Sequence, residues 1–279
     1  MASARQNEAA AQVNRPLPLF AHSASGPADA PWITFVPGIG NDRTFWHGQT
    51  ERLAQNYRVL VFDPWGHGES PAPPENCTFS DIAPGILALW DSLGISQSAL
   101  VGLGFGGSLS LYLAATAPQR VSRLVALCCR PRQPDDRQAF WRDRRNKAAE
   151  LGIPALTKIT VDRWLSDDFR ASHPAIDAAL REAMQRTTLA GYQAYTGAFA
   201  EMDFTDRIGS ISCPVQLVAA EHDHGGGPVA AMTELAGQIA GAGLIVIPGS
   251  GHICVAEAPE AVATILSEFF APGQHRGQR

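Results

Sequence analysis

The chain has 279 residues, of which 45% are hydrophobic and 18% are charged, and its formal net charge is −5. This composition indicates a globular protein with an ample core, built as one large domain or as one domain with an insertion. The mild charge argues against nucleic acid or an anionic membrane as a partner. No apolar run is long enough to predict a membrane span or a secretory signal.

The five cysteines are odd in number and contain no C-x-x-C pair. We therefore expect neither a disulfide framework nor a structural zinc site, and a reducing, cytoplasmic environment fits this usage best. The polar segments 1–14 and 271–279 are expected to be mobile ends. The sequence carries no signature of an oligomeric interface.

Six apolar runs bounded by turn residues predict strands that are covered on both faces, as in a parallel sheet. In chain order they span residues 32–36, 57–62, 99–101, 121–127, 215–219 and 244–247. Helical spacing of apolar residues predicts helices at 44–55, 82–93 and 259–270, and the small-residue stretch 108–115 indicates a fourth. The alternation of strands and helices predicts an α/β fold with a mostly parallel, doubly wound sheet.

Residues 131–206 interrupt this alternation, since they are rich in Arg, Trp and Ala and predict several helices but no strand. We expect this segment to form a helical cap that is inserted into the sheet domain. The predicted organisation is therefore a core made of residues 16–130 and 207–271, with a cap made of residues 131–206.

The glycine-rich segment 102–107 separates the strand at 99–101 from the helix at 108–115. A strand, a sharp glycine-rich turn and a helix form the layout of the nucleophile elbow, G-x-S-x-G. Gly104 takes the place of the serine, so this position has no side chain with which to form a covalent intermediate. Ser108 lies one helical turn further on, and we expect it to pack behind the elbow rather than to replace the nucleophile.

A possible base and its orienting acid follow the last two predicted strands. His252 comes after the strand at 244–247, and Asp223 comes after the strand at 215–219. The chain order of elbow, acid and histidine is the order that accompanies a nucleophile elbow. We therefore interpret His252 as the general base and Asp223 as the residue that orients it. Glu221 is the nearest competitor for the acid, and ordinary turn residues are the alternative for both positions.

The loop after the first predicted strand contains Gly38 and Ile39, and such a loop donates one backbone N–H to an oxyanion hole. The residue after the nucleophile position, Phe105, donates the other; a tight turn without this role is the alternative. The loop around His67 reads as structural. His222 and His224 lack a third ligand, so we predict no metal site there.

These segments resemble the α/β-hydrolase superfamily over residues 16–270 and, within it, the 3-oxoadipate enol-lactonase group. The resemblance implies an α/β-hydrolase fold and the hydrolysis of small lactones or esters of carboxylic acids without a cofactor. It also implies a serine where this chain has Gly104. The segments that carry it are Phe45-Trp46, Tyr57-Arg58-Val59-Leu60, Gly66-His67-Gly68-Glu69-Ser70, Ala117-Pro118-Gln119-Arg120-Val121, Asp162-Arg163-Trp164-Leu165, Phe169-Arg170-Ala171-Ser172-His173-Pro174 and Met202-Asp203-Phe204-Thr205-Asp206-Arg207-Ile208.

Two cap arginines, Arg144 and Arg163, lie in segments that face the active-site cleft in the family that the chain resembles. A guanidinium group suits a substrate carboxylate, but a solvated arginine on a charged helix is an equal alternative. Trp141 and Trp164 are expected either in the core of the cap or along the substrate pocket. The arginines of residues 137–145 are so dense that we expect most of them in solvent: Arg137, Arg142, Arg144 and Arg145.

Gly104 leaves three hypotheses open for a protein whose partner is a small molecule. The first is a hydrolase-family protein whose serine chemistry is impaired or absent. The second is an enzyme in which His252, paired with Asp223, acts directly as a base in C–C cleavage, decarboxylation, elimination or cofactor-free oxygenation. The third is a pseudoenzyme that binds a ligand without turnover.

Overall fold

The computed structural model describes residues 17–75 and 77–271. The expected mobile ends lie outside the described residues, apart from Ala271. Within the described part, seven strands form one sheet in the order β1-β3-β2-β4-β5-β6-β7, in which only β1 is antiparallel to its neighbour. The strands are β1 His22–Ser25, β2 Trp32–Val36, β3 Arg58–Phe62, β4 Ser98–Leu103, β5 Val121–Leu127, β6 Val215–Ala220 and β7 Gly243–Ile247.

All six predicted strands are present, and their bounds differ from the predicted ones by no more than two residues at either end. The edge strand β1 was not predicted, because its four residues are exposed and its sequence, HSAS, has no apolar run. The central strands are continuous apolar runs because helices cover both of their faces.

Helices cover the two faces of the sheet and form two separate apolar clusters against it. On one face lie α3 Phe79–Ser92, α4 Phe105–Thr116 and α9 Val229–Gln238, and on the other lie α2 His47–Leu53, α10 Cys254–Glu257 and α11 Pro259–Phe270. The predicted helix at 44–55 is in fact a 3-10 turn, η1 Arg43–Trp46, followed by α2. A second 3-10 turn, η2 Pro118–Arg120, precedes β5.

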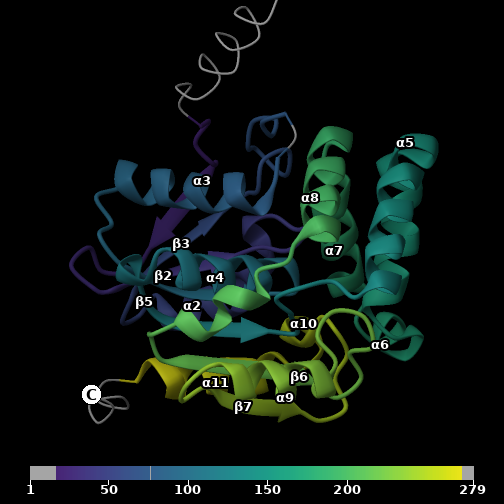
Figure 1. Cartoon of the computed structure of the whole chain (residues 1–279). Helices are drawn as coiled ribbons and strands as arrows, with labels where there is room; N and C mark the ends of the chain where they lie inside the picture. Colours follow the sequence, from purple (N-terminus) through teal and green to yellow (C-terminus); the bar gives the residue numbers. More distant parts are fainter. Residues whose placement is uncertain (1–16, 76, 272–279) are drawn as a thin grey trace, which may run out of the picture.

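The segment for which the sequence predicts a cap contains four α-helices that stand together beyond one end of the sheet (Figure 1). The long helix α5 is kinked at Gly152, where φ is 73°, and Pro154 follows two residues later. An isolated antiparallel bridge between Arg132 and Asp203 ties the two ends of the segment together. The elements are α5 Asp135–Trp164, α6 Asp167–Ser172, α7 Pro174–Gln185, α8 Leu189–Glu201 and the 3-10 turn η3 Thr205–Ser210. The bounds of the cap as a domain stay a prediction.

The cap docks onto the loop that follows β3 through a contact between two glycines. A Cβ atom on Gly191 in α8 would lie 2.6 Å from the carbonyl oxygen of Gly66, so neither backbone could approach as closely with a side chain present. Thr188 donates its N–H to the Gly66 carbonyl at 2.7 Å, and Gly68 donates to the Arg186 carbonyl at 3.1 Å. Arg186 also forms an ion pair with the buried Asp42, which lies beside the Gly38 loop.

Among the described residues, no helix combines the length and the apolar character that crossing a bilayer would require.

We predict that Gly191→Ala lowers the free energy of unfolding by about 1–3 kcal/mol, because the added methyl group overlaps the Gly66 backbone. Urea unfolding monitored by tryptophan fluorescence measures this change. The matched control is Gly48→Ala in α2, where a Cβ would meet no atom within 4 Å. Since alanine is the better helix former, the control should be neutral or slightly stabilising. Equal effects of the two substitutions would contradict the proposed glycine contact.

Candidate active site

The turn between β4 and α4 holds Gly104 in a conformation that favours glycine, with φ 57° and ψ −116°. Hydrogen bonds fix this turn on both sides: Gly104 N–H donates to the Leu127 carbonyl, and Ser108 N–H donates to the Gly104 carbonyl, each at 2.9 Å. A Cβ atom at position 104 would lie 3.0 Å from His252 Nε2. A side chain at this position would therefore point directly at the imidazole ring.

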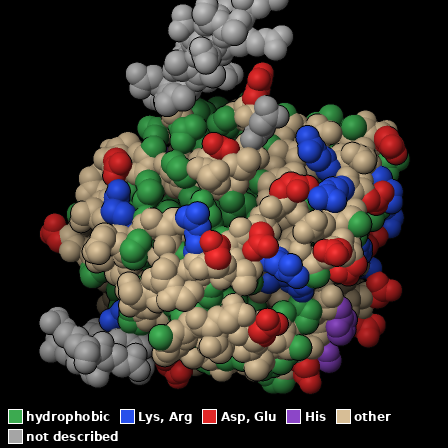
Figure 2. All heavy atoms as spheres, viewed as in Figure 1, with side chains coloured by type: hydrophobic (Ala, Val, Ile, Leu, Met, Phe, Trp, Pro, Cys, Tyr) green, Lys and Arg blue, Asp and Glu red, His purple; other side chains and the backbone are tan. Residues whose placement is uncertain are grey.

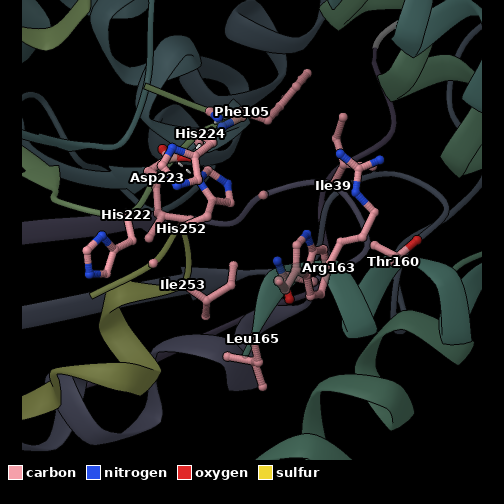
Figure 3. Close-up of a pocket in the computed structure, with 18 of the residues that line it drawn as sticks. Ile39, Phe105, Thr160, Arg163, Leu165, His222, Asp223, His224, His252 and Ile253 are labelled. Carbon is pink, nitrogen blue, oxygen red and sulfur yellow. Dashed lines mark hydrogen bonds and ion pairs between the residues drawn. The ribbon is translucent and has the colours of Figure 1, made fainter. Parts of the chain in front are cut away.

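His252 and Asp223 form a hydrogen-bonded pair at the carboxyl ends of neighbouring strands. Asp223 follows β6 and His252 follows β7, and His252 Nδ1 lies 3.0 Å from Asp223 Oδ2. With Nδ1–H donating to the carboxylate, Nε2 is the nitrogen that faces Gly104. Figure 3 shows this pair on one side of the cavity, with Arg163 and Thr160 of α5 on the other.

Three successive backbone N–H groups hold the carboxylate of Asp223 in place. Gly225 and Gly226 donate to Oδ1 at 2.9 and 2.8 Å, and Gly227 donates to Oδ2 at 2.7 Å. Because these donors fill its remaining acceptor positions, the carboxylate has a fixed orientation toward the imidazole.

The two groups shift each other's pKa values in opposite directions. Burial alone would raise the pKa of Asp223, but the charge and hydrogen bond of His252 and the N–H donors outweigh it, so the pKa lies well below its ordinary value. Burial alone would lower the pKa of His252, but the Asp223 charge and hydrogen bond raise it above the ordinary value. The Asp223 carboxylate therefore favours the protonated form of His252.

The alternative acid, Glu221, and the alternative nucleophile, Ser108, form hydrogen bonds with other groups. Glu221 is exposed and accepts the N–H of Gly249 at 2.8 Å, so Asp223 is the carboxylate that contacts His252. Ser108 is fully buried and donates to the Arg130 carbonyl at 2.8 Å, behind the elbow.

Within the described residues, one group of possible metal ligands is close together: Cys128, Asp223 and His252, whose ligand atoms lie within 4.8 Å of one another. Cys128 is buried in the core next to Cys254, with their sulfurs 4.0 Å apart. The Asp223 oxygens already accept three backbone N–H groups and bond to His252, so the carboxylate is poorly disposed to ligate a metal.

The Gly38 loop and the start of α4 bring two backbone N–H groups to the elbow. Ile39 and Phe105 both line the cavity, and Phe105 is the first residue of α4, so its N–H has no acceptor within the helix. His67 holds the Gly38 loop in place through a hydrogen bond to its backbone. It is fully buried, its Nδ1 lies 3.0 Å from the Trp65 carbonyl, and its Nε2 accepts the N–H of Gly40 at 3.1 Å.

A cavity of about 520 Å³ lies between the elbow and the cap. All ten residues that the sequence predicts for the site line it, although their catalytic and binding roles stay a prediction. They are Gly38, Ile39, Gly104, Phe105, Trp141, Arg144, Arg163, Trp164, Asp223 and His252.

Arg144 is only 5% exposed, and its hydrogen bonds go to neutral groups, the hydroxyls of Tyr192 and Thr160. The solvated alternative is therefore wrong for this residue. Arg163 lines the same cavity, with its guanidinium carbon 4.6 Å from the centre of the Phe140 ring. It is also exposed to solvent, so both alternatives for this residue stay open.

Sequence reasoning missed Arg137, which also lines the cavity instead of lying in solvent. Its guanidinium carbon is 4.4 Å from the centre of the Phe140 ring. The density of arginines hid this role, but their spacing would have shown it. Residues 137, 140, 141 and 144 follow the i, i+3, i+4, i+7 pattern of one helix face, which leaves out Arg142. Asn41, which is 98% buried, was also missed.

Residues 35–265 match the model of the "Alpha/beta hydrolase family". The chain is 28% identical over 248 residues to 3-oxoadipate enol-lactonase 1 of Acinetobacter baylyi, an alignment that covers 88% of this chain and 90% of the relative.

Two solved structures are similar throughout. The enol-lactonase from Burkholderia xenovorans LB400 has a TM-score of 0.86 and 28% identity, over 90% of this chain and 95% of its own. The malate-bound thermophilic esterase from Thermogutta terrifontis has a TM-score of 0.83 and 26% identity, over 90% of this chain and 92% of its own.

We predict that Asp223→Asn lowers the pKa of His252 by more than one unit, because the substitution removes the negative charge that stabilises the imidazolium. An NMR titration of the His252 ring measures the change. Glu221→Gln, which alters a nearby carboxylate that does not contact the ring, is the control and should leave the titration unchanged. A larger shift in the control would assign the orienting role to Glu221.

We predict that acid weakens the fold through His67. Burial lowers its pKa to about 4, whereas the unfolded chain takes up this proton near pH 6.5. Since the unfolded state binds more protons between these values, stability falls as the pH drops from 6.5 to 4, by up to about 3 kcal/mol. Urea unfolding at pH 7.5, 5.5 and 4.5 measures the loss. His67→Gln, which cannot titrate, should show a flatter pH dependence, and identical slopes would contradict this role.

Proposed function

The chain belongs to the alpha/beta hydrolase family, and from that premise we propose that it binds a small lactone or ester of a carboxylic acid at the cavity above Gly104. In this proposal His252 and Asp223 form the proton-transfer pair, and the N–H groups of Ile39 and Phe105 form the oxyanion hole. The bound molecule is handled without a covalent acyl-enzyme, because Gly104 offers no nucleophile. Serine-type hydrolysis is accordingly impaired or absent.

The observation that carries the proposal is the distance of 3.0 Å between His252 Nε2 and the position of a Cβ atom on residue 104. A nucleophile must lie within hydrogen-bond reach of its base, and a side chain on residue 104 would begin within that reach of His252. The relatives support the substrate class, since two similar proteins of Acinetobacter baylyi and one similar solved structure are named as enol-lactonases.

The cap supports a substrate that carries a carboxylate. A buried guanidinium without a negative partner is unfavourable, and Arg144 has only neutral hydroxyls as partners. A carboxylate placed against Arg144 and Arg163 would supply the missing charge and match the fork of the guanidinium. Trp141 and Trp164 would then pack against the apolar part of the ligand.

A second candidate function is a reaction in which His252 acts directly on the substrate or on a water molecule. The completeness of the Asp223–His252 pair favours it, because the pair would have no task in a protein that only binds. Although burial alone would lower it, the Asp223 carboxylate raises the pKa of His252 above its ordinary value, and the ring must lose its proton before it can act as a base. Activity of this kind should therefore increase as the pH rises.

Our proposal also includes a cytoplasmic location. The structure gives all five cysteines as free thiols, which supports a reducing compartment.

We predict that Gly104→Ser increases the hydrolysis of enol-lactones and aryl esters by at least about 100-fold, since it supplies a nucleophile within reach of His252. Steady-state and burst kinetics measure the gain. Gly104→Ala is the matched control: it introduces the same backbone strain, about 1–3 kcal/mol, but no hydroxyl, and should show no gain.

The remaining outcomes decide between the hypotheses. Activity that is highest with Gly104 and that disappears in His252→Ala would contradict the disabled hydrolase and support direct-base chemistry. Ligand binding without turnover in the original chain and in Gly104→Ser would favour the pseudoenzyme.

A further inference from the structure

Asn41 presents an amide group to the cavity that no described residue satisfies. Its side chain lines the cavity and is only 2% exposed. The amide oxygen, Oδ1, is buried and has no hydrogen-bond partner among the described residues. Polar atoms that are buried in this way are nearly always paired in proteins. A molecule that enters the cavity is in a position to supply the partner.

This setting sets Asn41 apart from most polar side chains of the protein. On the face of the molecule that Figure 2 shows, acidic and basic side chains are interspersed at the surface, where water can reach them. Gln133 also has a buried amide oxygen without a partner among the described residues, but it does not line the cavity. Arg137 and Trp141 do line it, but they belong to α5 of the cap. Asn41 is thus the residue of this kind on the loop that follows β2.

A tight turn fixes the direction of the Asn41 side chain. The N–H of Asn41 donates to the Gly38 carbonyl at 3.3 Å, and Gly40 inside the turn has φ 77°, which favours glycine. The Gly40 N–H donates to Nε2 of the buried His67 at 3.1 Å. A Cβ atom on Gly40 would lie 2.3 Å from Met184 Sδ, so the cap packs directly on the turn. Held by His67 and by the cap, Asn41 is preorganised for binding.

The amide of Asn41 lies next to the groups that would hold a substrate carbonyl. A Cβ atom on Gly38 would be 3.4 Å from Asn41 Nδ2 and 3.6 Å from the Leu103 carbonyl oxygen. Gly38 precedes Ile39, whose N–H is the proposed oxyanion donor, and Leu103 precedes Gly104 at the elbow. A ligand group bound at Asn41 would therefore be attached close to the carbonyl carbon.

The surroundings of Asn41 favour a neutral partner that can donate a hydrogen bond. The neighbouring charge is already engaged, because Asp42 accepts from Thr44 and pairs with Arg186. His67 is neutral near pH 7, since burial lowers its pKa to about 4. The unpartnered Oδ1 is an acceptor, so a ketone, an ether or a carboxylate cannot pair with it. A hydroxyl group both donates and accepts, and it satisfies the amide whichever way the amide is turned.

We propose that Asn41 is a specificity-determining residue that binds a hydroxyl group on the carbon next to the substrate carbonyl. The preferred ligands are accordingly lactones or esters of 2-hydroxy acids. In the complex, the hydroxyl donates to Asn41 Oδ1, and the carbonyl oxygen accepts from the N–H groups of Ile39 and Phe105. This inference rests on the proposed function for the lactone or ester and adds the hydroxyl group.

A protein-observed NMR titration tests the inference without requiring turnover. The probes are γ-butyrolactone, the two enantiomers of α-hydroxy-γ-butyrolactone, and α-methoxy-γ-butyrolactone. One hydroxy enantiomer should bind about tenfold or more tightly than the unsubstituted and the methoxy lactones, because a methoxy oxygen accepts but cannot donate. Asn41→Leu keeps the shape of the side chain without its polar atoms. It should abolish this preference and leave the affinity for γ-butyrolactone nearly unchanged.

The matched control is Gln133→Met, which removes another buried amide with an unpartnered oxygen, outside the cavity, and should keep the preference. Urea unfolding separates binding from folding. Because Asn41→Leu removes a buried acceptor that has no partner among the described residues, this variant should be at least as stable as the original chain. A marked loss of stability would give Asn41 a structural role and overturn the inference.

Equal affinity for γ-butyrolactone and for both hydroxy enantiomers would overturn the inference, as would a preference that survives Asn41→Leu. Methoxy binding as tight as hydroxy binding would overturn the requirement for a donor. If none of the lactones binds, the proposed function fails and the inference fails with it. Binding of all of them with the same affinity contradicts the inference alone.

Discussion

The hydrogen bond between His252 and Asp223 is the interaction on which the rest of the site depends, and the sheet makes it possible. Strands β6 and β7 pair in parallel, with Ala220 opposite Ile247, so the loops that follow them emerge side by side. The N–H groups of residues 225–227 hold the Asp223 carboxylate in the orientation in which it contacts the imidazole. Because both the acid and the ring are held by backbone geometry, Nε2 has a defined direction, and that direction is toward Gly104.

The cap forms the other wall of the cavity, and close packing of backbone against backbone sets its position. Its position is set by close backbone contact, Gly191 against Gly66, and by the ion pair of Arg186 with the buried Asp42. Several of its outer arginines pair with neighbouring acids, whereas Arg144, which lines the cavity, donates to the hydroxyls of Tyr192 and Thr160. A guanidinium tolerates this setting because its charge is delocalised, but a bound anion improves it. The docking of the cap thus brings these arginines to the cavity that Asp223 and His252 also line.

The sequence predicted the strands and the loops after them because a buried parallel sheet requires continuous apolar runs, and its functional residues lie where those runs end. The same reasoning could not find β1, whose exposed residues have no such run. Reasoning from strand ends predicted that Asp223 and His252 share one site. The cap arginines were expected in solvent because so many of them lie close together in the sequence, and Arg137 was missed for this reason. Helix periodicity carried that information, whereas the burial of Arg144 depends on Tyr192 and Thr160, which come from elsewhere in the cap and could not be inferred from local sequence.

In a typical nucleophile elbow, the side chain can face the base only if the backbone adopts a strained conformation, and Gly104 avoids that strain because it has no side chain. A residue with a side chain must be held there in a left-handed conformation, at a cost in stability, so that the side chain can face the base. Glycine adopts φ 57° without this cost, and the hydrogen bonds to Leu127 and Ser108 keep the turn in place. The elbow is therefore relaxed where a nucleophile would be strained, yet the base, its carboxylate and the loop that His67 supports keep their geometry. The function that we propose for this site is therefore built from proton transfer at His252 and from the stabilisation of negative charge by backbone N–H groups.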